Sequence, residues 1–320
     1  MQYNPLVSII IPVYNGANYV GHAIECALAQ TYKNTEIIVV NDGSSDNGET
    51  DEVVKKYTSE KIRYFVKENG GVSSALNYAI KKMNGDWFSW LSHDDGYYPE
   101  KIERQVEMIN FLSQKENLPP EDYVIYGANE TIDSQGNVIL RKKHRINNQS
   151  LIIDILLDNI HDYKICGCAV LVHKRQLVEI GGFNEEIRTV SDAECFYRLI
   201  LRGLRFFYLD EVLVQSRQHK KQIGKQKAQL FREEGDKFHL WLLKQIEMHD
   251  EWKKPEYYLR FYAGVKKRGY SESEKAAKKD IIGMFGSKYK PKLFLIGFEY
   301  GLKGKIRSIL RWMYRRVRVK

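Results

Sequence analysis

The first hundred residues alternate between short apolar runs and amphipathic segments. Val7–Val13 is a continuous apolar run of strand length, which is typical of a strand buried on both faces. Asn18–Gln30 follows it with apolar residues at helical spacing. Further strands are expected at Glu36–Val40, Ile62–Val66 and Trp87–Leu91, and further helices at Glu52–Tyr57, Ser73–Met83 and after Pro99. This alternation predicts an α/β fold with a mainly parallel sheet and helices on both faces.

The middle of the chain is less regular, and its last hundred residues are helical and basic. Strands are expected at Tyr123–Ala128, Asn137–Arg141, Cys168–Val172, Phe206–Leu209 and Val212–Gln215, and helices at Leu151–Asn159 and Asp192–Gly203. After about Gly224 the strand pattern ends. We therefore divide the chain into an α/β domain over residues 1–222 and a helical basic region over residues 223–320.

Four polar clusters follow the predicted strands at the point where each strand ends. They are Tyr14–Gly16, Asn41–Asp46, Glu68–Gly71 and Ser92–Asp95. Ligands of such sheets bind in the crevice beyond the carboxyl ends of the strands. The sequence therefore predicts a binding site at this edge of the sheet.

The carboxylates in these clusters have two interpretations. Asp94 and Asp95 suit a hard cation such as Mg²⁺, but Asp is also common in a turn before a helix such as Tyr97–Glu100. Their position after the fourth strand favours the cation site. Asp42 is able to accept hydrogen bonds from a nucleobase or a ribose, whereas in isolation it indicates only an Asx turn.

Six segments resemble, in order, the motifs of family 2 of the glycosyltransferases, of the inverting, non-processive bacterial type. They are "VSIIIPVYNG", "EIIVVNDGSSD", "ENGGVSSALNYAI", "GDWFSWLSHDD", "GGFNEE" and "SDAECFYRLILRG", and they run over roughly residues 6–222. The resemblance implies a GT-A, Rossmann-like fold and a nucleotide-sugar donor.

The resemblance also implies a role for each matching residue at the donor site. Pro12, Tyr14 and Asn15 would line the base and ribose, and Asp42 would recognise the base, usually uracil. The resemblance also places Asn69, Gly71 and Asp94 at the donor. Ser92 and His93, within the same motif as Asp94, are further donor-binding candidates. Gly167 either permits a close backbone approach to the donor or marks an ordinary strand bulge.

A divalent cation, Mn²⁺ or Mg²⁺, is the cofactor that the resemblance implies. Asp94 matches the second acidic position of the family's Asp-x-Asp motif, and His219 resembles the histidine that completes the metal or diphosphate site in many such enzymes. Ser92 stands where the first Asp is usual, which leaves open whether Asp94 or Asp95 is the direct ligand.

Asp192 matches the catalytic base of the family, although Ser191 replaces the usual preceding Glu. The implied enzyme is a metal-dependent hexosyltransferase-type glycosyltransferase. It would move a sugar from a UDP-sugar to a hydroxyl of a saccharide or lipid-linked acceptor, with inversion, in bacterial surface polysaccharide synthesis. Two alternatives remain. A catalytically impaired nucleotide-sugar-binding scaffold is motivated by Ser92, and a nucleotidyltransferase is disfavoured because "PVYNGANY" lacks a basic residue.

The charge is divided unevenly along the chain. Residues 1–220 carry 24 Lys and Arg against 30 Asp and Glu, whereas residues 221–320 carry 26 against 11. Residues 303–320 combine Lys and Arg with apolar residues at helical spacing, which suits either a helix at an anionic membrane surface or a helix docked on the domain. Nucleic acid is not an expected partner, because the body is acidic and no known module is present.

The expected location is the cytoplasm, with the tail peripheral on the inner face of the membrane. The N-terminus does not resemble a signal peptide, and no apolar run approaches the roughly 20 residues that span a bilayer. The four cysteines, Cys26, Cys166, Cys168 and Cys195, are therefore expected to be free thiols.

Overall fold

The structure is a computed structural model of the chain. It describes residues 3–57, 59–116, 118–141, 148, 151–162, 165–219, 222 and 226–300. The chain divides into two compact units, one of Met1–Ile152 with Lys164–Ala228 and one of Ile153–Tyr163 with Gln229–Lys320. The first unit thus extends a few residues beyond the predicted boundary at 222. The helix predicted at Leu151–Asn159 lies almost wholly in the second unit, because the chain crosses between the units more than once.

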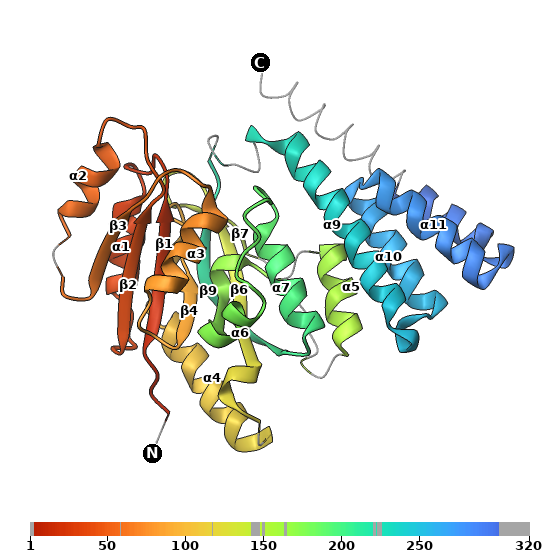
Figure 1. The fold of residues 1–320 in the computed structure, drawn as a ribbon, viewed down its shortest axis with the longest axis horizontal. Coiled ribbons are helices and arrows are strands. Elements are labelled where there is room, and N and C mark those ends of the chain that lie inside the picture. The colour runs from red at the N-terminus through yellow and green to blue at the C-terminus, as the bar shows by residue number, and fades with distance from the viewer. Residues whose placement is uncertain are drawn as a thin grey trace. The chain divides into compact units, whose positions relative to one another are not determined.

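Nine strands of the described chain form one sheet in the first unit (Figure 1). They are β1 (Val7–Val13), β2 (Thr35–Asn41), β3 (Ile62–Val66), β4 (Trp87–Trp90), β5 (Gly96–Tyr97), β6 (Tyr123–Ile132), β7 (Val138–Arg141), β8 (Val170–His173) and β9 (Arg205–Arg217). Their order is β3-β2-β1-β4-β8-β6-β9-β5, with β7 paired to β6.

Helices cover both faces of this sheet. They are α1 (Val20–Leu28), α2 (Glu49–Lys55), α3 (Val72–Lys82), α4 (Lys101–Glu116), α6 (Lys174–Glu179) and α7 (Ser191–Leu201). Apolar residues of α1 and α4 share one core with alternate residues of β1 and β2, including Ile9 and Ile37. The intervening residues Ile10 and Ile38 are also fully buried, and α3 packs against the same two strands. Both faces of β1 and β2 are therefore covered, as their continuous apolar runs predict.

The sheet is parallel in its first half and mixed in its second. β3, β2, β1 and β4 pair in parallel, whereas β8 pairs antiparallel with both β4 and β6. The two strands predicted at Phe206–Leu209 and Val212–Gln215 are one strand, β9. It pairs with β6 through register shifts beside Ala128, where turn-like Asp210 and Glu211 interrupt the apolar pattern without ending the strand.

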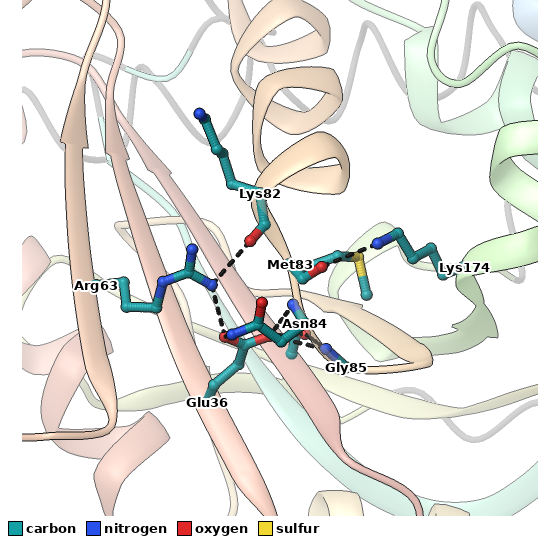
Figure 2. A network of polar contacts seen from close by, with 8 residues as sticks. Glu36, Arg63, Lys82, Met83, Asn84, Gly85 and Lys174 are labelled. Atoms are coloured by element: carbon teal, nitrogen blue, oxygen red, sulfur yellow. Dashed lines mark hydrogen bonds and ion pairs between the residues drawn. The ribbon is translucent and has the colours of Figure 1, made fainter.

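Glu36 is the second residue of β2, at the amino-terminal edge of the sheet, and its carboxylate lies in a network of polar contacts (Figure 2). Its carboxylate accepts hydrogen bonds from Ser8 Oγ at 2.6 Å, Arg63 Nη1 at 2.9 Å, and the backbone N–H groups of Asn84 and Gly85 at 2.6 and 2.9 Å. Burial opposes ionisation of this group, but these bonds outweigh it and lower the pKa of Glu36. The buried charge therefore ties β1, β2 and β3 to the turn before β4.

The second unit is helical. It contains α5 (Ile152–Asp162, whose first residue belongs to the first unit), α9 (Ala228–Met248), α10 (Pro255–Arg268), α11 (Ser271–Phe285) and a helix over residues 290–300. α10 begins at Pro255, whose missing N–H is harmless there, and ends at Gly269 in the left-handed region at φ 77°. No helix among the described residues combines the length and apolar character needed to cross a membrane.

A buried histidine lies in the core of this second unit. His239 is 2% exposed, its Nδ1 donates to the carbonyl oxygen of Gly235 at 2.6 Å, and its ring lies 4.8 Å from that of Tyr270. Burial lowers the pKa of its imidazole to about 4. The folded protein therefore holds this histidine neutral at neutral pH.

We expect His239 to make folding stability depend on pH. The unfolded chain binds a proton at a pKa near 6.5, so the contribution is complete above that pH and is lost as the pH falls towards 4. Between pH 7 and pH 5 the free energy of unfolding should fall by about 2 kcal/mol through this group. Urea unfolding of wild type and His239→Gln at both pH values checks this. Equal changes in the two proteins would contradict it.

Candidate functional site

The first two polar clusters are joined directly at the carboxyl edge of the sheet. Asn15 follows β1 in the left-handed region at φ 49°, where Asn is tolerated. Its backbone N–H donates to Ser44 Oγ at 2.9 Å, and its Oδ1 accepts from the backbone N–H of Ser45 at 2.7 Å. The Tyr14 hydroxyl lies 3.3 Å from Ser45 Oγ, and its side chain remains exposed. The structure thus brings Tyr14 and Asn15 together with the loop that begins at Asp42.

Asp42 organises the third cluster around its own carboxylate. It accepts from Lys67 Nζ at 2.8 Å and from the backbone N–H groups of Gly70 and Gly71 at 3.0 and 2.6 Å. The Asn69 amide donates to the Asp42 carbonyl oxygen at 2.8 Å. Gly71 has φ 88°, which favours glycine at this turn. Hydrogen bonds between the loops that follow β2 and β3 therefore bring together the predicted nucleoside-binding residues Asp42, Asn69 and Gly71.

Asp94 and His219 lie against each other although 125 positions separate them in the sequence. His219 Nε2 is 2.9 Å from Asp94 Oδ2, and both side chains are mostly buried. The His219 ring lies 5.2 Å from that of Tyr19, just before α1. The end of β9 and the turn after β4 thus meet beside the start of the first helix.

Asp95 differs from Asp94 in its surroundings. Its Oδ1 accepts from the backbone N–H of Arg217 at 2.8 Å, and its Oδ2 accepts from the Cys168 thiol at 3.3 Å. Burial, and then the neighbouring Asp94 charge, raise the pKa of Asp95 to about 7. Both oxygens of Asp95 are therefore engaged by protein groups.

Arg217 is a residue of this site to which the sequence assigned no role, although it begins the stretch Arg217–Gln222 that contains His219. It is 6% exposed, its Nε donates to the Asp94 carbonyl oxygen at 2.9 Å, and its Nη1 donates to the Asp133 carbonyl oxygen at 3.2 Å. Its guanidinium lies 4.9 Å from the centre of the Tyr19 ring. Its position two residues before His219 was the available signal, but the partners come from distant segments. Arg217 holds the end of β9 against the Asp94 turn.

His93 and Ser92 lie in the same turn. The His93 ring donates to the Pro12 carbonyl, and burial lowers the pKa of its imidazole. Ser92 Oγ lies 3.3 Å from Cys168 Sγ, so the serine that replaces the usual carboxylate contacts a thiol that also bonds Asp95.

Asp192 lies at the start of α7, beside Gly167. A Cβ atom at Gly167 would lie 3.3 Å from Asp192 Oδ2 and 3.1 Å from the Trp90 ring, so glycine allows a close approach. Burial under the surrounding protein raises the pKa of Asp192, although part of its surface is still open to solvent. A carboxylate with a raised pKa is a better proton acceptor near neutral pH.

The residues at Asp94 fit a divalent cation only in part. Within the described part of the chain, no group of three or more His, Cys, Asp or Glu side chains is arranged to hold a metal ion. Asp94 and His219 together offer one oxygen and one nitrogen ligand. Mg²⁺ commonly takes one or two protein ligands and completes its shell with water and phosphate oxygens. The pair therefore fits a metal that is shared with a bound diphosphate.

Comparisons with known proteins agree with this geometry. Residues 8–170 match the sequence model of glycosyl transferase family 2. An uncharacterized glycosyltransferase of Rickettsia typhi is 39% identical over an alignment of 323 positions, which covers 97% of each chain. One of Rickettsia conorii is 49% identical over 228 residues, or 70% of this chain, but the match spans only 36% of that relative.

The fold is also found in a solved structure. The crystal structure of S. aureus TarS 1–349 in complex with UDP-GlcNAc matches with a TM-score of 0.61 at 17% sequence identity. The match covers 92% of this chain and 80% of that chain. The predicted GT-A fold with a helical C-terminal region is confirmed.

Proposed function

The chain belongs to glycosyl transferase family 2, and we propose that it transfers a sugar from a UDP-sugar to a hydroxyl of a saccharide or lipid-linked acceptor. The observation that carries this is the Asp94–His219 pair, 2.9 Å apart. It lies at the carboxyl edge of the sheet, which also carries the Asp42 loop. The UDP-GlcNAc bound to TarS supports a uridine donor.

The Asp42 loop binds the base and ribose in this proposal. The Asp42 carboxylate already accepts three hydrogen bonds, and a carboxylate has about four lone-pair directions. One direction remains for the N–H of uracil. The exposed Tyr14 ring and the Asn15 loop stand beside it and complete the nucleoside contacts.

Asp94 and His219 hold Mn²⁺ or Mg²⁺ in this proposal. Such a cation neutralises charge on the departing diphosphate. Asp95 supports the same turn through the Arg217 backbone and is not a direct ligand, because both of its oxygens are engaged. Arg217 keeps His219 beside Asp94.

Asp192 is the general base of an inverting displacement. The acceptor oxygen forms a bond to the anomeric carbon while the bond to the diphosphate oxygen breaks on the opposite face. The hydroxyl proton passes to Asp192, and the electron pair of the broken bond leaves with the diphosphate. Such proton removal contributes on the order of 10²–10⁴-fold to the rate.

In this proposal the acceptor binds in a polar hollow of about 410 Å³ beside α7. The hollow is lined by Asn77, Gly181, Gly182, Phe183, Asn184, Glu185, Glu194 and Arg198. Amide, carboxylate and guanidinium groups are able to bind sugar hydroxyls. The Phe183 ring lies 6.1 Å from that of Trp90, which contacts Gly167 beside Asp192. We propose a saccharide there, as part of bacterial surface polysaccharide synthesis at the cytoplasmic face of the membrane.

A thermal-shift panel of nucleotides and nucleotide sugars, with and without Mn²⁺, tests the proposal. Bound ligand stabilises the fold according to its concentration relative to its Kd. A uridine preference that requires Mn²⁺ is expected, and the absence of any nucleotide response would contradict the proposal. Transfer or slow hydrolysis of the preferred UDP-sugar separates an enzyme from the impaired scaffold that Ser92 motivates.

We expect Asp42→Asn to weaken UDP binding by about 10- to 100-fold, because a charge-assisted hydrogen-bond network is lost. The amide has one acceptor oxygen, and its NH₂ group would face the N–H donors that now bind the carboxylate. Titration of UDP measured by thermal shift checks this. Asp86→Asn, an exposed carboxylate at the opposite edge of the sheet, is the control. Unchanged UDP affinity in Asp42→Asn would exclude Asp42 from base recognition.

The basic tail at residues 303–320, predicted to lie at a membrane or on the domain, falls outside the described residues. We propose that this tail binds an anionic membrane surface, and the high density of Lys and Arg in its sequence is the support for this.

A further inference from the structure

The helix over residues 290–300 has apolar side chains on two faces. On its inner face Leu293 is 3% exposed, and the Tyr300 hydroxyl lies 2.7 Å from His161 Nε2 of α5 in the same unit. On its outer face Phe294, Leu295 and Phe298 are 71%, 63% and 60% exposed. The inner face therefore packs the helix onto its unit, whereas the outer face presents large apolar side chains to solvent.

The three exposed side chains form one continuous patch. At about 100° per residue they fall within an arc of about 100° on the helix. The Phe294 and Phe298 rings are stacked, with centroids 6.4 Å apart. Adjacent exposed aromatic and aliphatic side chains of this kind mark a surface for a protein or a membrane, whereas single exposed residues are ordinary.

Exposed lysines precede the patch along the chain. Lys288, Lys290 and Lys292 precede it and are all exposed, and Glu299 is the only acidic residue between Gly286 and Lys320. Three of the eleven Lys and Arg in that stretch are these lysines, and the other eight belong to the tail at 303–320. An apolar face bordered by lysines has the character of a helix that lies in the interface of an anionic bilayer.

We propose that this outer face docks on an anionic lipid surface, with Phe294, Leu295 and Phe298 entering the interface and the three lysines binding lipid phosphates. The surface is formed by described residues and does not depend on the tail at 303–320. A second copy of the chain is a poorer occupant, because a symmetric contact here would place like charges together. Three side chains also fall far short of the roughly 800 Å² that each partner buries in a stable interface.

Vesicle co-sedimentation of the full chain tests the proposal. Vesicles of phosphatidylcholine alone are compared with vesicles that also contain phosphatidylglycerol, whose anionic headgroups attract basic segments. Wild type should bind the anionic vesicles. The triple variant Phe294→Ser/Leu295→Ser/Phe298→Ser should bind them at least about 10-fold more weakly. The matched control replaces three exposed apolar residues of β7 in the first unit, Val138→Ser/Ile139→Ser/Leu140→Ser, and should bind as wild type does.

Further variants distinguish binding by this helix from binding by the basic tail. Lys288→Gln/Lys290→Gln/Lys292→Gln should lose binding to anionic vesicles and the salt dependence that accompanies it. Arg315→Gln/Arg316→Gln/Arg318→Gln alters only the tail. If the tail variant loses binding and both helix variants retain it, the proposal is overturned. Phe298→Ser alone is a milder substitution for use if the triple variant does not fold, and it should also weaken binding to anionic vesicles.

Two other outcomes would also overturn the proposal. One is wild type that binds neither kind of vesicle. The other is a concentration-dependent dimer that the triple variant converts to monomer while vesicle binding stays unchanged, which would assign the face to a second copy. The UDP thermal shift should be the same in wild type and the triple variant, so failure here is distinguishable from failure of the proposed transferase function.

Discussion

Asp192→Asn should lower kcat for sugar transfer by about 10³-fold while UDP binding is unchanged. The amide has the shape of the carboxylate and can still accept the backbone hydrogen bonds that Asp192 receives at the start of α7. It has no basic oxygen to accept the acceptor proton. Product formation from a UDP-sugar and an acceptor, together with the UDP thermal shift, checks both parts of the expectation.

Glu186→Gln is the matched control for this variant. It removes one exposed carboxylate six positions earlier, on the same connecting segment, and should retain wild-type activity. Retention of more than about a tenth of the activity in Asp192→Asn would exclude a general base at this position.

The pH profile adds a second readout for Asp192. Burial raises its pKa, and the base must be ionised to accept a proton. Activity should therefore fall as the pH decreases through this raised pKa, at a higher pH than a free Asp side chain would give. Asp192→Asn should lack this acidic limb in its residual activity.

Loss of an outer-shell partner of a metal site costs up to about 100-fold in metal affinity. Asp94 is proposed as a direct ligand, so Asp94→Asn should weaken the Mn²⁺-dependent part of UDP binding by at least about that factor. Asp95→Asn should weaken the same Mn²⁺-dependent binding by about 10-fold or less. Asp95 affects the metal site only through its hydrogen bond from the Arg217 backbone, and the amide can still accept that bond. The difference follows from the partners of the two carboxylates, since Asp94 faces His219 and Asp95 faces Cys168 and Arg217.

UDP titrations with and without Mn²⁺ compare these two variants. Without Mn²⁺, both variants should bind UDP with the affinity of wild type. The metal-free titration of each variant is therefore the control for its titration with Mn²⁺. Loss of the Mn²⁺ response in Asp95→Asn, with retention in Asp94→Asn, would reverse the assignment of the ligand.

Much of the first unit could be predicted from the sequence. β1 is buried on both faces and reads as a continuous apolar run, so its predicted bounds coincide with those in the structure. The predicted bounds of β3 coincide as well, although this edge strand is only partly buried. The polar clusters that follow these strands lie on one edge because parallel strands share their direction. Asp42, Asp94 and Asp192 could be chosen as candidate site residues because local sequence motifs identify them without knowledge of their partners.

Other features depend on contacts between segments far apart in the chain, which no local pattern encodes. The helix α5 belongs to the second unit, where Arg260 of α10 binds Asp158 at 2.9 Å across more than a hundred positions. Burial of both Asp95 oxygens requires β9 and Cys168 to arrive beside the turn after β4. Arg217 and the outer face of the 290–300 helix were not recognised from the sequence for the same reason.

The sequence by itself determined the class of fold, the edge of the sheet that carries the candidate site, and the residues proposed for its chemistry. Periodicity reports which faces are buried, and motifs report which groups are present at a strand end. Only the tertiary structure decided that Asp94 pairs with His219, that Asp95 turns to Arg217 and Cys168, and that Phe294, Leu295 and Phe298 stay exposed. The physical reason is that hydrogen-bond partners and exposure are set by packing between distant segments.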